Sequence, residues 1–157
     1  MIHLEGVYTA LVTPFDGGQV DYAALRRIVD QQVAGGVAGI VPVGTTGESP
    51  TLTCEEHLKV IETVIEQAAG RCQIIAGTGA NSTAEAVHLT REAKAAGADA
   101  TLQVTPYYNK PTQEGLYRHF STVADEVGLP VVLYNVPGRS GVPIAEATVA
   151  RLSKNPM

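Results

Sequence analysis

Two hydroxyls in a glycine-rich segment are the first residues whose type and spacing could do chemistry. Thr45 and Thr46 stand in the run Gly-Thr-Thr-Gly-Glu-Ser (44–49), directly after an apolar stretch. The glycines allow backbone N–H groups to converge on an anion beside the two hydroxyls. Because the run lacks the Gly-Lys-Ser/Thr ending of a nucleotide P-loop, a carboxylate fits it better than a nucleotide. The alternative is a glycine-rich turn whose threonines only cap the backbone, and the residues alone leave both readings open.

Three phenols and one guanidinium form a second candidate group. Tyr107 and Tyr108 follow one apolar run, and Tyr134 ends another. A phenol can pass a proton when its neighbours hydrogen-bond the phenolate. Arg139 follows a Pro-Gly turn and could hold a substrate carboxylate through two hydrogen bonds. The plainer alternatives are core or interface aromatics and a solvated surface arginine.

Short β-branched runs alternate with longer stretches that have apolar residues at helical spacing. The strands are expected at Val7–Val12, Gly39–Val43, Gln73–Ala76, Ala100–Thr105 and Val131–Tyr134. Helices are expected from about Tyr22 to Ala34, after Thr53 to near Gly70, after Ser82 to before Gly97, from roughly Gln113 to Val127, and from near Pro143 or Ile144 onward.

The helix starts carry capping patterns. Asp21 is placed as the N-cap of the first helix, and Thr53 has Glu56 three residues later, which is the spacing of a capping box. Ser82 with Glu85 repeats that spacing. The sequence therefore predicts three well-defined helix N-termini.

The strands recur about every 30 residues, the length of one strand-helix-strand crossover, so we expect a parallel sheet. Apolar runs such as 131–133 indicate strands buried on both faces. An open doubly wound sheet and a closed barrel both satisfy this pattern. The barrel is favoured because all five strand ends carry polar or aromatic groups, whereas an open sheet gathers them at one switch point.

We therefore predict an α/β fold, a (β/α)8 TIM barrel of which the first five β/α units are present. Residues 1–157 would form the N-terminal portion of a single catalytic domain. A complete barrel needs eight strands and usually about 250 residues. The chain is accordingly expected to be part of a longer polypeptide.

Composition excludes several classes of function. The formal net charge is -5 and no run of Lys or Arg occurs, so neither nucleic acid nor a membrane surface is expected as a partner. With no apolar stretch of about 18 residues and no leader pattern, a cytoplasmic location is predicted. Cys54 and Cys72 do not form a C-x-x-C pair and are expected to be reduced. The scattered histidines predict no metal site, and no cofactor is expected.

Three motifs in this order and at these separations resemble the dihydrodipicolinate synthase family of pyruvate-dependent class I aldolases. They are Thr45-Thr46-Gly47-Glu48-Ser49, Tyr107-Tyr108-Asn109-Lys110-Pro111 and Tyr134-Asn135-Val136-Pro137-Gly138-Arg139-Ser140. The resemblance covers essentially the whole chain. Each motif is shared across the wider aldolase group, which includes N-acetylneuraminate lyase, but the three together are specific to the synthases.

The resemblance implies that pyruvate forms a Schiff base with a lysine and then condenses with L-aspartate 4-semialdehyde, in lysine and diaminopimelate biosynthesis. Thr45, Tyr108 and Tyr134 would form the proton relay, with Tyr108 reaching into a neighbouring subunit of a homotetramer built as a dimer of dimers. Thr46 and nearby amides would hold the pyruvyl carboxylate. Arg139 would bind the carboxylate of the semialdehyde, and it distinguishes the synthases from the sialic-acid lyases.

Some members of the family are inhibited by L-lysine at a tight dimer interface. Pro50 and Cys54 replace residues that some inhibited relatives use there, while an exposed helical histidine is the plain alternative for His57. The positions of this chain that match the lysine site are Ser49, His57, Asn81, Glu85 and Tyr107.

The family's Schiff-base lysine is expected beyond the last residue of this chain. Its own lysines, at 59, 94, 110 and 154, fall on helix faces, in a loop or near the terminus, and none ends a strand. The 157-residue chain is therefore predicted to have no synthase activity. Two alternatives stay open: a related aldolase acting on another aldehyde, and a non-catalytic remnant that binds pyruvate-like acids or pairs with a full-length subunit.

Overall fold

The computed structural model describes residues 2–157. Its centre is a five-stranded, all-parallel sheet in which sequence neighbours are also spatial neighbours, in the order β1-β4-β5-β6-β7. A separate antiparallel hairpin follows the first strand and consists of β2 (Phe15–Asp16) and β3 (Gln19–Val20). The strands of the main sheet are β1 (Tyr8–Ala10), β4 (Gly39–Val41), β5 (Gln73–Gly77), β6 (Ala100–Val104) and β7 (Val131–Tyr134).

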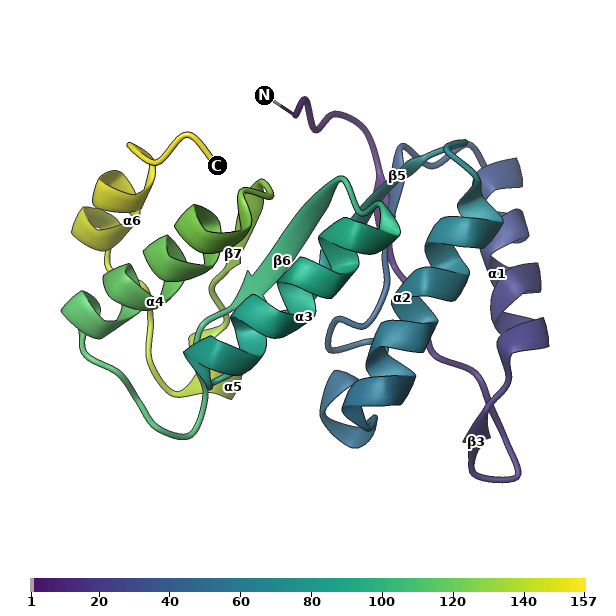
Figure 1. Ribbon diagram of the computed structural model, residues 1–157, viewed down its shortest axis with the longest axis horizontal. Coiled ribbons are helices and arrows are strands. Elements are labelled where there is room, and N and C mark those ends of the chain that lie inside the picture. The colour runs from purple at the N-terminus through teal and green to yellow at the C-terminus, as the bar shows by residue number, and fades with distance from the viewer. Residues whose placement is uncertain (1) are drawn as a thin grey trace.

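The helices lie side by side in chain order and form one layer against the sheet (Figure 1). Two short helical turns stand apart from this layer, η1 (Ser49–Thr51) and α5 (Pro137–Ser140). The helices of the layer are α1 (Tyr22–Ala34), α2 (Cys54–Ala68), α3 (Thr83–Ala96), α4 (Gln113–Val127) and the shorter α6 (Glu146–Leu152).

The main core fills the space between the helix layer and the sheet. Leu25 of α1, Ile61 of α2 and Ile40 of β4 are each fully buried there. Complete burial of one such aliphatic side chain is worth roughly 1.5–3 kcal/mol. A second, smaller cluster joins α4 to α6 through Leu116, Phe120, Ile144 and Leu152.

The three helix starts predicted from capping patterns are confirmed. The side chain of Asp21 accepts a hydrogen bond from the N–H of Ala24 at 2.8 Å. At Thr53 both bonds of the capping box are present, with Oγ1 accepting from Glu56 N and Glu56 Oε2 accepting from Thr53 N. Ser82 caps α3 through its Oγ alone.

Some predicted boundaries were wrong. The first strand covers three residues rather than six, and the hairpin 15–20 and helix α5 were not predicted. The last helix begins at Glu146 rather than at Pro143 or Ile144, because Ile144 is drawn into the second core cluster and Ala145 is the N-cap. On α2, Leu58 is only half-buried, since the buried face runs through His57, Val60, Ile61 and Val64.

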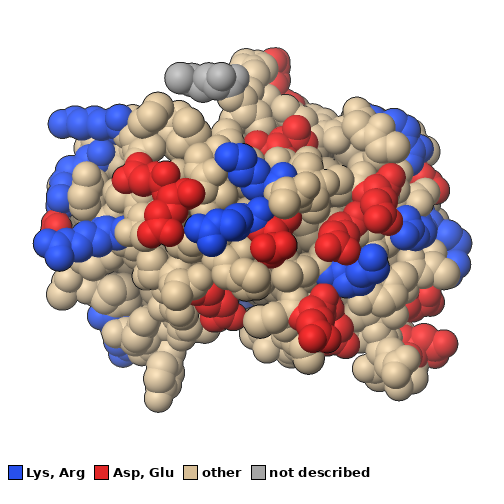
Figure 2. Space-filling model, in the orientation of Figure 1, with Lys and Arg blue, Asp and Glu red and all other residues tan. Residues whose placement is uncertain are grey.

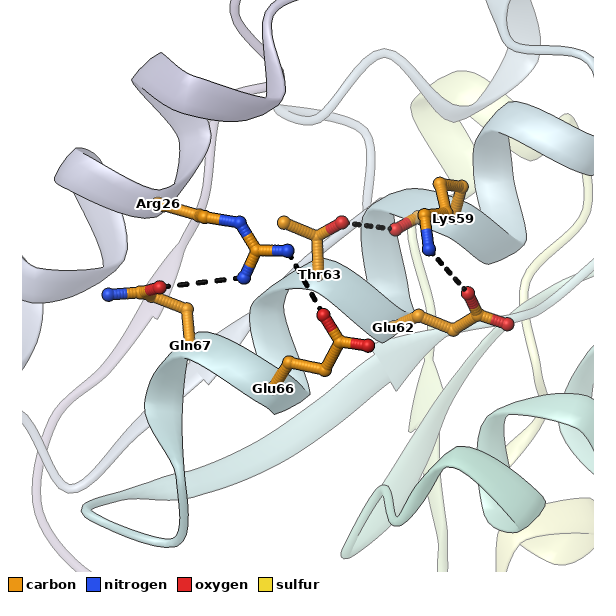
Figure 3. A network of polar contacts seen from close by, with 6 residues as sticks. All are labelled: Arg26, Lys59, Glu62, Thr63, Glu66 and Gln67. Carbon is orange, nitrogen blue, oxygen red and sulfur yellow. Dashed lines mark hydrogen bonds and ion pairs between the residues drawn. The ribbon is translucent and has the colours of Figure 1, made fainter.

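The viewed surface carries acidic and basic side chains intermixed, without a continuous field of either sign (Figure 2). One polar network joins α1 to α2: Arg26 contacts Glu66 at 3.0 Å and Gln67 at 3.5 Å (Figure 3). On α2 itself, Lys59 pairs with Glu62 at 3.2 Å. Within residues 2–157, no helix combines the length and apolar character that a bilayer crossing requires. Cys54 is exposed and Cys72 is partly buried, and the two are not joined by a disulfide.

Candidate active site

A cavity of about 260 Å³ opens at the carboxyl ends of the parallel strands. This volume lies just below the range of about 300–1,000 Å³ typical of pockets for drug-sized ligands, so the cavity suits a smaller molecule. Its wall is largely apolar, with a few polar groups. The lining residues are Val43, Gly44, Thr45, Ser49, Pro50, Gly77, Gly79, Leu102, Val104, Tyr107, Tyr134, Val136, Arg139 and Ser140.

The glycine-rich segment after β4 is a compact turn closed by its own backbone. Gly47 N donates to Gly44 O at 3.1 Å, and the buried Thr13 hydroxyl donates to Gly47 O at 2.7 Å. Within residues 2–157, the amides of Thr45 and Thr46 have no hydrogen-bond acceptor. Thr45 lines the cavity, whereas the exposed Thr46 does not. Thr45 therefore offers a free N–H donor and a hydroxyl to the cavity, and Thr46 carries the same two groups next to it, outside the lining.

The wall beside this turn is built by an unusually close backbone approach. Val43 is buried and has a φ of 53°, a left-handed conformation that is rare for a β-branched residue. A Cβ on Gly77 would lie 2.7 Å from the carbonyl carbon of Val43, so only glycine fits there. Gly77 and Gly79 thus serve close packing of the wall, and this explains the Gly-Thr-Gly pattern without a ligand.

Tyr134 at the end of β7 and Arg139 in the segment that follows line the same cavity. Tyr134 ends the strand, and its carbonyl accepts from the N–H of Thr105 at 3.0 Å. Arg139 lies on α5, and its guanidinium has no ion-pair or hydrogen-bond partner within the described part of the chain. An unpaired guanidinium at a cavity edge is suited to binding a carboxylate.

The tyrosine loop after β6 presents its two phenols differently. Tyr107 lines the cavity, and its burial raises the pKa of its phenol, with the carboxylate of Glu85 adding to the rise. Tyr108 is 91% exposed and has a φ of 70°, so its ring does not enter the cavity of its own chain. Asn81 donates to Tyr107 O at 3.3 Å, while Asn109 donates to Asn81 O at 3.1 Å. These two bonds hold the loop against the start of α3.

Comparison with known proteins decides the family. Residues 3–157 match the Dihydrodipicolinate synthetase family. The chain belongs to this family. The 4-hydroxy-tetrahydrodipicolinate synthase of Nitrobacter hamburgensis is 60% identical over 148 residues, which make up 94% of this chain and 50% of that protein.

Solved structures of dihydrodipicolinate synthases superpose closely. The chloride-inhibited enzyme of Acinetobacter baumannii, complexed with pyruvate, has a TM-score of 0.96 at 53% identity and covers 98% of this chain and 53% of its own. The enzyme of Cyanidioschyzon merolae with lysine bound has a TM-score of 0.91 at 43% identity, covering 94% and 51%. The predicted fold class, part of a (β/α)8 barrel, is confirmed. The chain spans about half the length of these relatives.

Of the positions expected to bind L-lysine, His57 and Tyr107 both lie close enough to Glu85 for its carboxylate to act on their pKa values. His57 is buried rather than exposed, and its Nε2 lies 2.7 Å from Gly77 O, where it donates as the protonated nitrogen. Burial lowers the pKa of His57, while the Gly77 carbonyl and the Glu85 carboxylate act in the opposite direction. Cys54 Sγ lies 3.9 Å from Glu85 Oε1. The exposed-histidine alternative for His57 was therefore wrong.

A buried polar cluster behind the cavity wall was not predicted from the sequence. Gln103 of β6 is fully buried, and its Nε2 lies 2.8–3.0 Å from the hydroxyls of Thr78, Thr90 and Thr101. The Oε1 of Gln103 has no partner within the described residues. Because the polar face of β6 points under the helices, its apolar neighbours Leu102 and Val104 form the cavity wall. Strand alternation was the only available sign, and it does not tell which face is the inner one.

The chain's own lysines stay away from the cavity. Lys59 pairs with Glu62, and Lys94 donates to Val127 O at 2.6 Å. Lys110 and Lys154 are exposed. No lysine lines the cavity within residues 2–157, and these residues hold no cluster of three or more His, Cys, Asp or Glu side chains placed for a metal ion.

Proposed function

We propose that this chain forms the N-terminal portion of a single barrel domain of a 4-hydroxy-tetrahydrodipicolinate synthase. The enzyme would condense pyruvate, held as a lysine Schiff base, with L-aspartate 4-semialdehyde in lysine and diaminopimelate biosynthesis. The observation that carries this proposal is that Thr45, Tyr134 and Arg139 line one small cavity although they come from two separate strand ends.

Each residue has a role that its surroundings support. The free amides of Thr45 and Thr46, with the Thr46 hydroxyl, would hold the pyruvyl carboxylate at the cavity edge. The hydroxyls of Thr45 and Tyr134 would pass protons during imine formation and cyclisation. The guanidinium of Arg139, which has no partner within the described chain, would bind the carboxylate of the semialdehyde.

The nucleophilic amine is assigned to the part of the relatives' length that this chain does not span. A class I aldolase needs a lysine that burial keeps partly unprotonated beside the substrate. The lysines here pair on helix faces or are exposed. Treatment with pyruvate and borohydride should therefore leave the 157-residue chain unmodified and should label a family-length polypeptide that carries these residues.

Steady-state kinetics of that family-length polypeptide test the function. We expect turnover of pyruvate with aspartate semialdehyde and none with N-acetylneuraminate or 2-keto-3-deoxy sugar acids. Thr45→Val and Tyr134→Phe should each lower kcat by about 10²–10⁴, the usual range for a lost proton-transfer group. Arg139→Ala should raise KM for the semialdehyde while KM for pyruvate stays within about twofold, with Arg139→Lys intermediate. Preferential cleavage of sialic acid would refute the proposal.

Tyr108 would complete the relay in a neighbouring subunit of a homotetramer. Its 91% exposure and the left-handed backbone that turns it outward support this assignment. Mixing Tyr108→Phe subunits with Thr45→Val subunits tests it, because a mixed dimer would regain one intact relay. Recovery of activity on mixing is expected. A mixture no more active than the separate variants would show that Tyr108 does not act across subunits.

L-Lysine is proposed as an effector at the cluster formed by Ser49, His57, Asn81, Glu85 and Tyr107. The Glu85 carboxylate could hold the amino group of lysine, and the bond from His57 to Gly77 O links this cluster to the cavity wall. Isothermal titration with L-lysine should give binding that Glu85→Gln weakens at least about tenfold, the loss expected for one charged hydrogen bond. D-Lysine is the matched control. Equal binding by Glu85→Gln would remove the effector site.

A further inference from the structure

The segment that carries Arg139 is a closed loop tied back to its own beginning. Ile144 N donates to Asn135 Oδ1 at 3.1 Å, which joins the end of the loop to the residue after β7. Inside the loop, Ser140 Oγ lies 3.2 Å from Val136 O and 3.0 Å from Val142 O, so its single proton is shared between them. Arg139 sits within this ring of hydrogen bonds.

One side chain from another element fastens the loop to the helix layer. Gln113 is the first residue of α4, and its Nε2 donates to Pro143 O at 2.9 Å. Its Oε1 accepts from Ala145 N at 2.9 Å and from the Thr148 hydroxyl at 2.7 Å. The side-chain amide of Gln113 thus donates to one residue and accepts from two. These three residues close the Arg139 loop and start α6.

Gln113 also lies next to the tyrosine loop. Thr112, directly before it, caps α4 by accepting from Gly115 N at 3.2 Å. The preceding loop contains Tyr107 of the cavity wall and the exposed Tyr108, with left-handed backbone at 108 and 110. Strained segments of this kind persist only where their surroundings hold them. The start of α4 therefore contacts both the tyrosine loop and the loop that carries Arg139, which line the same cavity.

We infer that Gln113 is a positioning residue for Arg139, holding the guanidinium in register with the tyrosine loop across the cavity. The inference rests on the proposed function for the role of Arg139. The part that concerns how Gln113 holds the loop does not depend on that function. Ile144 keeps the loop attached through its burial with Leu116 and Phe120. The hydrogen bonds of Gln113 fix the orientation of the loop, because they are directional and apolar contacts are not.

Amide hydrogen exchange by NMR on the 157-residue chain tests the inference directly. In Gln113→Ala, the amide of Ala145 loses its acceptor, so its faster exchange would report only the lost hydrogen bond. Ile144 keeps its acceptor Asn135, so its exchange reports whether the loop still holds its shape. We expect the protection of Ile144 to fall about tenfold, the factor that corresponds to about 1.4 kcal/mol. Gln67→Ala, which removes another interhelical glutamine, is the control and should leave Ile144 unchanged.

Gln113→Glu supplies a readout that a purely structural loss would not produce. An ionised glutamate still accepts from Ala145 and Thr148 but cannot donate to Pro143 O, whereas the protonated acid can donate again. The measured quantity is the ratio of the Ile144 protection factor in this variant to that in the unsubstituted chain at the same pH. At pH 7 this ratio should be about one tenth. It should return toward one as the pH falls through the range near 4.3 in which glutamate is protonated.

Binding of succinate, followed through the Arg139 Nε–Hε resonance, separates this inference from the proposed function. Weaker succinate binding in Gln113→Ala, by about threefold to tenfold, together with lowered Ile144 protection supports the positioning role. Unchanged Ile144 protection in Gln113→Ala overturns it. No response of Arg139 to succinate in the unsubstituted chain refutes Arg139 as a carboxylate ligand, while a tenfold loss at Ile144 still supports Gln113 as the residue that positions it.

Discussion

Acidification should weaken this fold chiefly through one histidine on α4. His119 is 5% exposed, its Nδ1 lies 2.9 Å from Thr83 Oγ1, and its Nε2 is buried without a partner in the described chain. The Phe120 ring stands edge-on to it at 5.1 Å. Protonation would place a charge in a buried site where Nε2 has no acceptor within the described chain. Burial accordingly lowers the pKa of His119 from 6.5 to about 4.

The size of the effect follows from that pair of values. The unfolded chain takes up a proton on this ring below pH 6.5, and the folded chain takes it up only near pH 4. Stability linked to His119 is thus complete above pH 6.5 and is lost as the pH falls toward 4. Between pH 7.5 and pH 5.0 the loss amounts to about 2 kcal/mol. His57, whose pKa burial also lowers, contributes in the same direction.

His119→Phe isolates the contribution of this ring, because phenylalanine keeps the aromatic packing and removes the titrating nitrogens. Urea unfolding followed by circular dichroism at the two pH values measures the difference. The variant should lose about 2 kcal/mol less than the unsubstituted chain on acidification, and should be the more stable protein at pH 5.0. His88→Phe, at an exposed position of α3, is the control substitution of the same type. If His119→Phe and the unsubstituted chain lose equal stability, the desolvation argument for His119 is wrong.

Three further predictions concern the close packing, the helix cap and the polar network described above, and each is tested by urea unfolding at neutral pH. Gly77→Ala should destabilise the fold by about 1–3 kcal/mol because its Cβ would lie 2.7 Å from the carbonyl carbon of Val43. Gly138→Ala is the control and should be nearly neutral, since a Cβ there would meet no neighbouring atom within 4 Å. Equal effects of the two substitutions would contradict the close-approach argument. Thr53→Ala should cost about 1 kcal/mol through loss of the capping box, and Thr53→Ser should recover most of it. Arg26→Ala should cost less than about 1 kcal/mol, since its contacts with α2 are solvent-exposed, and a larger loss would mean that the network of Figure 3 is cooperative.

The sequence predicted those features that depend on local chemistry or on strand order. Capping by Asp21 and Thr53 requires only neighbouring residues, so both could be read from spacing. Thr45, Tyr134 and Arg139 could be expected at one edge because the carboxyl ends of parallel strands meet there. The family resemblance strengthened this expectation, since it joined motifs that are individually weak.

The features that escaped prediction depend on contacts between distant segments. Helix α5 has four residues, too few for a periodic pattern, and it is held by the ring of bonds around Ser140. The burial of His57 depends on a carbonyl 20 residues away, at Gly77. Gln103 looked like an ordinary polar strand residue, yet it lies fully buried beneath α3. No local rule reports these partners, because each becomes available only after the sheet has formed.

Each strand of the sheet pairs with the strand of the preceding β/α unit, and this order has a kinetic consequence. A newly made unit needs only the unit before it as a template, so the loops that must close during folding stay short. At the usual translation rate of about 5–20 residues per second, one unit of about 30 residues leaves the ribosome every few seconds. The nascent polypeptide can therefore fold stepwise from the amino end. Each completed β/α unit provides the strand with which the next strand pairs.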